Sequence, residues 1–185
     1  MKLVLTIACC LFLVTNVWAQ TKPTVAKMPT ENYPTAGWKS YHDSTKGFAL
    51  QYPTSWDADN TRENTPLFLF SPLKENDDFR ENFNIQVGGG GGTLDEYIKL
   101  NINDLKSSIK NFKIVSQRKL IYNGNSAFEI VFTGALETVS FPLRWKQRYV
   151  LTDRGSFVVT YSTVAGKTDD HAATSDLVFK TFFIF

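Results

Sequence analysis

Residues 112–132 read FKIVSQRKLIYNGNSAFEIVF, and the pattern of this stretch determines the fold class. Two runs rich in β-branched and aromatic residues flank Asn123-Gly124, and Asn-Gly is the strongest short signal for a β-hairpin. A second pair of such runs, 143–151 and 156–162, is joined by the turn TDRG, which places glycine where a positive φ is needed. Consecutive hairpins of this kind predict an antiparallel meander.

Helical patterns flank the meander on both sides. Residues 93–111 read TLDEYIKLNINDLKSSIKN, and Thr93 with Glu96 has the spacing of a capping box at a helix start. Apolar residues then recur every three or four positions, which predicts an amphipathic helix: Leu94, Ile98, Ile102, Leu105 and Ile109. A second helix is predicted over about residues 169–180, which include Ala173, Leu177 and Val178.

Three further strands are predicted before the first helix. Residues 48–52 alternate apolar and small or polar side chains, and Pro53 ends the run because proline cannot donate to a strand ladder. Residues 66–72 (PLFLFSP) and 83–87 (FNIQV) read as two more short strands. The sequence therefore predicts an α+β fold, in which helices pack on an antiparallel sheet of six or seven strands.

Five glycines, 88–92, stand between the third of these strands and the first helix, and phosphate-binding loops share this layout. A P-loop requires lysine directly after its last glycine, but Thr93 follows Gly92 and the next lysine is Lys99. A dinucleotide loop requires a third glycine where this chain has Thr93, and it belongs to a parallel βαβ unit. The pattern favours a flexible strand-to-helix joint over a nucleotide site.

The first residues have the pattern of a secretory signal peptide. Lys2 precedes an apolar run from Leu3 to Val14, and Val17 and Ala19 occupy the small-residue positions before a cleavage site. The run is shorter than the ~20 residues of a membrane-spanning helix. We expect cleavage after Ala19, which makes residues 1–19 a signal peptide and the protein periplasmic or secreted, with no transmembrane segment in the mature chain.

Both cysteines, Cys9 and Cys10, lie within the signal, and too few apolar residues precede them for a lipoprotein signal. The mature chain then has no disulfide and no thiolate site. The formal net charge of +2 falls by one when Lys2 is removed, and such a small charge disfavours nucleic-acid binding. Residues 20–37 carry prolines and threonines without apolar periodicity and read as a linker, so the folded domain is placed at 38–185.

No motif for catalysis, a metal or a cofactor is present. The acidic loop carries Glu75, Asp77, Asp78 and Glu81, but it lacks the central glycine and ligand spacing of a calcium loop. No serine stands in G-x-S-x-G, and His42 and His171 lie near opposite ends of the domain. We therefore assign no catalytic, metal or cofactor-binding residue. A hydrolase or metal-dependent enzyme that uses the acidic loop or the histidines remains the alternative.

The most informative polar pattern is a row of cations in residues 143–151. Because side chains alternate along a strand, Arg144, Lys146 and Arg148 should share one face, opposite Trp145 and Tyr149. A solvent-facing strand flank is the plainer interpretation of this basic row. The functional hypothesis is that the three residues bind an acidic ligand or an unknown protein partner.

The order of these patterns resembles the PsbP-like superfamily, whose fold is shared with the Ran-binding nuclear-import factor and the DcrB-like envelope proteins. The segments that carry the resemblance are GFALQYPTSW, NFNIQV, TLDEYIKLNINDLK, NGNSAFEIVFTG, RWKQRYVLTDRGSFVVTYS and FKTFFIF. The resemblance implies an α/β/α sandwich around the antiparallel sheet over 38–185. It also implies a non-enzymatic binding or assembly module, and the signal's WAQ end suggests the envelope of a Gram-negative cell.

Overall fold

The computed structural model describes residues 36–62, 65–75 and 77–185. The expected signal peptide and nearly all of the expected linker lie outside this described part of the chain. The elements, in chain order, are β1 (Trp38–Asp43), β2 (Phe48–Pro53), β3 (Asp57–Asp59), β4 (Leu67–Phe70), β5 (Asn82–Gly88), α1 (Leu94–Ser108), β6 (Lys110–Tyr122), β7 (Asn125–Ala135), β8 (Leu143–Leu151), β9 (Ser156–Val164), α2 (Ala172–Thr181) and β10 (Phe183–Ile184).

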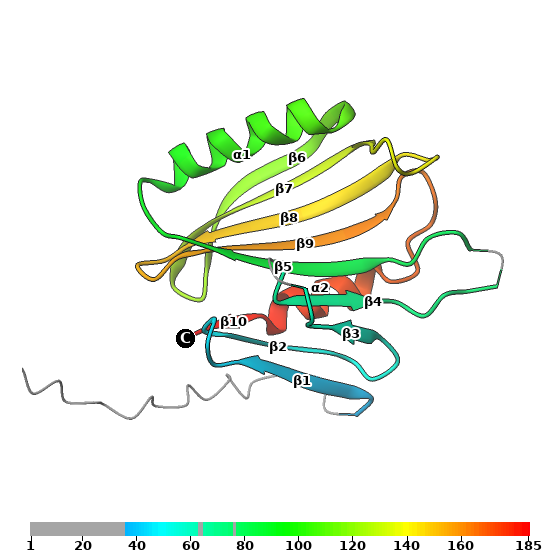
Figure 1. Ribbon diagram of the computed structural model, residues 1–185, viewed down its shortest axis with the longest axis horizontal. Coiled ribbons are helices and arrows are strands. Elements are labelled where there is room, and N and C mark those ends of the chain that lie inside the picture. Colours follow the sequence, from blue (N-terminus) through cyan, green and yellow to red (C-terminus); the bar gives the residue numbers. More distant parts are fainter. Residues whose placement is uncertain (1–35, 63–64, 76) are drawn as a thin grey trace, which may run out of the picture.

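The strands form two antiparallel sheets (Figure 1). The large sheet has seven strands in the order β3-β4-β5-β9-β8-β7-β6, and the small sheet has three in the order β1-β2-β10. The α+β class and the antiparallel central sheet are therefore confirmed. The strand predicted at 48–52 belongs to the small sheet, because β2 pairs with β1 on one side and with β10 on the other.

The hairpin that determines the fold is formed as its turn predicts. Asn123 and Gly124 have φ of 49° and 76°, and two successive positive values are those of the type I′ turn that suits the twist of a hairpin. β6 and β7 then pair along their length, with register shifts near Lys110 and Ile114. Gly134 is required opposite this irregularity, since a Cβ there would lie 2.2 Å from Ile109 Cγ2.

Helix α1 begins at its predicted cap. The Thr93 side chain accepts from the Glu96 backbone N–H, and the Glu96 carboxylate accepts from the Thr93 backbone N–H, so the capping box is confirmed. The helix ends at Ser108, three residues before the predicted end, because the extended Ile109 leads directly into β6. Helix α2 starts at Ala172 rather than near 169, since Asp169 Oδ1 accepts from the His171 backbone N–H and forms a turn before the helix.

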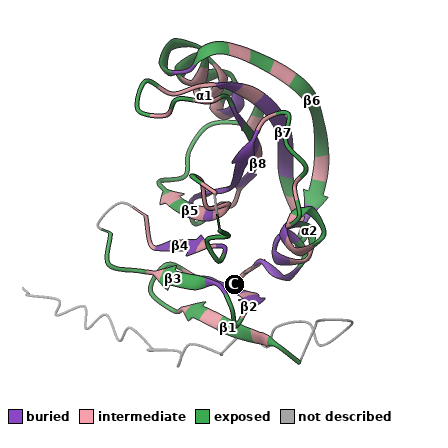
Figure 2. Cartoon of the chain, turned by 90° about the vertical axis from the view of Figure 1, so that its right-hand side faces the viewer, coloured by how far each residue is buried: buried purple, intermediate pink, exposed green. Residues whose placement is uncertain are grey.

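Two apolar cores lie on opposite faces of the large sheet. The α1-side core joins Ile98 of α1 to Ile130 of β7 and Trp145 of β8. The α2-side core joins Phe179 of α2 to the large sheet and to β2 of the small sheet. Figure 2 shows that β7 and β8 are mostly buried between these layers, whereas β6, at the sheet edge, is largely exposed. The arrangement is the α/β/α sandwich that the resemblance implied.

Candidate functional site

The basic row lies on the α2 side of β8, opposite Trp145 and Tyr149, as the alternation predicted. Its three members have different environments. Arg144 is exposed. The Lys146 side chain is 25% exposed, and its Nζ lies 2.6 Å from Asp176 Oδ1 of α2. Arg148 is only 8% exposed.

Arg148 belongs to a buried ion pair. Its Nη2 lies 2.6 Å from Glu129 Oε2, and Glu129 is itself 6% exposed. The register of the sheet makes this contact, because Glu129 of β7 stands directly opposite Arg148 of β8. The guanidinium also lies over the rings of Tyr122 and Phe179, at 4.7 and 4.8 Å from their centroids.

The plainer interpretation of the basic row as a solvent-facing flank is therefore wrong for Arg148. The buried Glu129 carboxylate draws its partner into the interior, where a charge is stable only when paired. Arg118 of β6 also lies 2.8 Å from Glu129 Oε1, from the exposed side of the network. The binding of an acidic ligand by Arg144, Lys146 and Arg148 stays a prediction, and only Arg144 is freely accessible to such a ligand.

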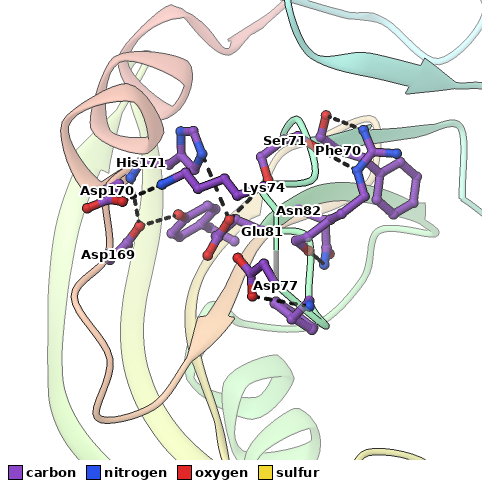
Figure 3. Close-up of polar contacts among 12 residues, drawn as sticks. Phe70, Ser71, Lys74, Asp77, Glu81, Asn82, Asp169, Asp170 and His171 are labelled. Carbon is purple, nitrogen blue, oxygen red and sulfur yellow. Dashed lines mark hydrogen bonds and ion pairs between the residues drawn. The ribbon is translucent and has the colours of Figure 1, made fainter.

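The acidic loop and the second histidine meet at the start of α2 (Figure 3). His171 Nε2 lies 3.9 Å from Glu81 Oε2, which accepts a 3.0 Å hydrogen bond from Ser71 Oγ. The adjacent Asp169 accepts a 2.8 Å hydrogen bond from Tyr161 Oη. Burial is the main cause that raises the pKa of the Tyr161 hydroxyl, and the bond to Asp169 adds to it.

This polar cluster lacks the geometry of a hydrolase. Ser71 is 0% exposed and donates to Glu81 rather than to an imidazole, so it is not an activated, accessible nucleophile. His42 does not take part, because it stacks on Phe185 at the start of β2, whereas His171 packs edge-on against Trp56 beyond the end of β2. Among the described residues, no group of His, Cys, Asp or Glu could hold a metal ion.

The glycine joint leads to a helix start that is already occupied. Glu96 Oε2 lies 2.9 Å from both the backbone N and the Oγ1 of Thr93. The hydrogen bond from the Thr93 backbone, followed by that from its hydroxyl, lowers the pKa of the Glu96 carboxyl. A carboxylate therefore takes the place where a phosphate-binding loop would hold its anion.

The large sheet has one face that its helix covers only in part. Helix α1 packs on β6, β7 and β8, and the same face continues beyond it over β9, β5 and β4 (Figure 1). The register places neutral polar and aromatic side chains on this continuation. We call it the open face, and it consists of Phe68, Phe70, Asn82, Asn84, Gln86, Thr160 and Ser162. Its β9 residues are buried, its β4 residues and both asparagines are half-buried, and Gln86 is exposed.

Hydrogen bonds connect the open face to the covered half. The Tyr149 hydroxyl donates to Gln147 Oε1 at 2.6 Å, and Gln147 Nε2 donates to Thr160 Oγ1 at 3.0 Å. In the register, Gln147, Thr160, Asn84 and Phe68 form one continuous row across four strands. Amides and hydroxyls in such a row can both donate and accept hydrogen bonds.

Two arginines cover the outer end of the open face. Phe68 and Phe70 stack with ring centroids 5.6 Å apart and an interplanar angle of 7°. The Arg62 guanidinium lies 4.2 Å from the Phe68 centroid, and that of Arg80 lies 5.4 Å from the Phe70 centroid. The Asp59 carboxylate at the same end of the sheet accepts a hydrogen bond from Arg62, and this bond is the main cause that lowers the pKa of Asp59 to about 2. Aromatic and arginine side chains are enriched in protein interfaces.

No residue of the open face was among the sequence-predicted site residues. The alternation of asparagine and glutamine with apolar residues in NFNIQV was a visible signal, because it marks a polar strand face. The row across β4, β5 and β9 depends on strand order, which the sequence did not supply. Within the described part of the chain, no helix is long and apolar enough to cross a membrane.

No family model and no curated protein sequence matches the chain. Solved structures do match its fold. LpqN of Mycobacterium tuberculosis, described as involved in cell envelope biogenesis, has a TM-score of 0.60 at 12% identity over 80% of this chain and 90% of its own. Cyanobacterial PsbP from Synechocystis has 0.56 at 15% over 82% and 95%, and a Mog1 variant has 0.56 at 9% over 80% and 95%. The chain therefore has the PsbP-like fold that its sequence pattern resembles.

Proposed function

We propose that the protein is an exported, non-enzymatic binding or assembly module of the cell envelope that engages a protein partner through the open face. One observation carries the proposal: a continuous row of neutral polar side chains, ending at stacked Phe68 and Phe70, lies beyond the cover of α1. Such surfaces combine adaptable hydrogen bonding with aromatic and arginine anchors, which is the composition of protein interfaces.

The comparisons support a binding role of this kind at the level of fold. LpqN is described as a protein of cell envelope biogenesis, and that setting agrees with the signal-peptide pattern of this sequence. The enzymatic alternative would depend on Glu81 and His171, whose neighbour Ser71 is wholly buried. The cluster is better explained as a set of polar contacts that hold the start of α2 in place.

Site-specific crosslinking tests the proposal. The expected mature chain lacks cysteine, so a single cysteine can carry a photoreactive label at Asn84 on the open face or at Arg144 in the basic row. Asp153, in the exposed turn between β8 and β9, provides a matched control position. In cells that naturally produce the protein, we expect the label at Asn84→Cys to give one recurrent adduct, which mass spectrometry identifies. The label at Asp153→Cys should not give this adduct.

The three labels distinguish the candidate surfaces. An adduct from Arg144→Cys alone would favour the acidic partner of Arg144, Lys146 and Arg148 over the open face. Equal adducts from all three positions would contradict a defined binding face. Export is tested separately, because N-terminal sequencing of protein recovered from the envelope should start at Gln20, and a start at Cys9 or Cys10 would contradict that expectation.

A further inference from the structure

Three cavities at the surface of the described chain differ in how their charges are balanced. In the cavity of about 450 Å³ beside the start of α1, Lys119 is paired with Asp95 at 2.6 Å. In the cavity of about 210 Å³ beside the start of α2, Lys74 is paired with Asp170 among further carboxylates. Lys119 and Lys74 each have a carboxylate partner in these cavities, and the second cavity holds more carboxylates than cations.

The third cavity, of about 340 Å³, lies beside the end of β5 and is different. Its described lining contains one charged side chain, that of Lys46, together with the neutral polar groups of Gln86, Tyr97 and Asn101. Lys46 is exposed, and its side chain forms no ion pair with a carboxylate of the described residues, although Asp43 Oδ1 accepts a 2.9 Å hydrogen bond from the Lys46 backbone N–H. Within the described part of the chain, the Lys46 ammonium at this cavity therefore has no ion-pair partner of its own.

A gap in the strand ladder lies along the same cavity. β5 pairs with β9 over its whole length to Gly88, but among the described residues its pairing with β4 stops at Ile85. Pro66, which precedes β4, does not extend the pairing because it has no N–H and its carbonyl oxygen accepts a 3.2 Å hydrogen bond from the Tyr41 hydroxyl. In an antiparallel strand, alternate residues direct their N–H and C=O to opposite sides, so the segment from Gln86 to Gly88 has backbone groups that face the cavity.

We propose that an extended, acidic peptide segment of the protein partner adds to β5 at this gap and places a carboxylate at Lys46. The proposal rests on the proposed function, since Gln86 belongs both to this cavity and to the open face. The end of β5, which has no β4 partner among the described residues, supplies the ladder hydrogen bonds, as in other cases of strand addition. Gln86, Tyr97 and Asn101 supply neutral hydrogen-bonding groups around the bound segment, and Lys46 selects for negative charge.

Selection from a phage library of short random linear peptides tests the charge preference. Peptides enriched on the wild-type protein should carry Asp or Glu at one fixed position, and Lys46→Glu should select Lys or Arg there instead. For one enriched peptide, Lys46→Gln should weaken binding about two- to fivefold, because an exposed ion pair contributes little. Lys113→Gln, at an exposed lysine of β6, should leave that binding unchanged.

The strand-addition part has its own readouts. An N-methyl group at every second residue of the enriched peptide should abolish binding, because the amides of those residues enter the ladder. An N-methyl group at the residues between them should leave binding unchanged. Amide resonances of Val87 and Gly88 should shift on binding. Uniform tolerance of N-methylation, shifts confined to other surfaces, or an acidic preference that persists in Lys46→Glu would each overturn the proposal. The proposal would also be overturned if acetate alone shifted the amide resonances of Val87 and Gly88 and no peptide were enriched.

These outcomes are distinguishable from failure of the proposed function. If the label at Asn84 captures a partner and no acidic peptide is selected, the open face binds its partner without strand addition at β5. If an acidic peptide binds at Lys46 and no label on the open face captures a partner, the peptide site exists and the proposed assembly role fails.

Discussion

Replacement of Arg148 by methionine should destabilise the protein through the carboxylate that it leaves behind. The two side chains of the Arg148–Glu129 pair are 9% and 8% exposed, and their charged atoms lie 2.6 Å apart. Loss of one member of a buried pair typically costs about 3–5 kcal/mol. Arg118 remains 2.8 Å from Glu129, so we expect the lower end, about 3 kcal/mol. In a domain of this size that equals a fall of about 6–12 °C in Tm.

The stability deficit of Arg148→Met should also depend on pH, and the pKa of Glu129 determines the direction of that dependence. Burial raises the pKa of Glu129, but the hydrogen bond and charge of Arg148, the charge of Lys146 and the hydrogen bond from Arg118 together outweigh burial and hold the pKa below its usual value. A carboxyl with a lowered folded-state pKa contributes stability above its unfolded pKa and loses it as the pH falls through the folded pKa. In Arg148→Met, burial should raise the Glu129 pKa, so the deficit should shrink on acidification from about pH 7 to about pH 4.

Urea denaturation across this pH range, followed by fluorescence, measures the effect. Arg144→Met is the matched control on the same strand and face, and as an exposed substitution it should change stability by less than about 0.5 kcal/mol. The double variant Arg148→Met with Glu129→Leu should recover most of the loss, because no unpaired charge remains. A deficit below about 1 kcal/mol at neutral pH, or one that does not depend on pH, would refute the reasoning.

Three further substitutions test the packing and the cap by the same denaturation assay. Thr93→Ala removes one side of the capping box and should cost about 1 kcal/mol, and an unchanged midpoint would contradict that role for the cap. Gly134→Ala should cost about 1–3 kcal/mol because its Cβ would overlap a neighbouring side chain, whereas Gly89→Ala, with open space around it, should be nearly neutral. Trp145→Ala should cost about 3–5 kcal/mol through the cavity it leaves in the α1-side core, and a loss below about 1 kcal/mol would contradict its burial.

The elements predicted from the sequence are those with strong local signals. The type I′ turn at Asn123-Gly124 and the capping box at Thr93 depend only on neighbouring residues, so the sequence determines them. β3 and β10 span three and two residues, too few for an alternation to be visible. β1 was missed because its burial alternates only weakly along an exposed edge.

The ion pair between β7 and β8 shows what single-strand patterns omit. The alternation in residues 143–151 correctly placed Arg148 opposite Trp145, but it could not show what Arg148 would meet. The missing information was the register with β7, which sets Glu129 against Arg148. A signal was present, because Glu129 is the one charged residue in the apolar run SAFEIVF, and such a charge requires a partner when the strand is buried.

The same strand joins the buried pair to the open face. Arg148 points to the α2 side, and its neighbours Gln147 and Tyr149 point to the α1 side, where they form the hydrogen-bonded chain to Thr160. A slip of one residue in β8 would turn Gln147 to the α2 side of the sheet and Arg148 to the α1 side. Because a buried charge tolerates only the register that pairs it, the contact with Glu129 disfavours that slip. The buried ion pair on the α2 side of β8 thereby fixes which polar groups of the strand lie on the α1 side.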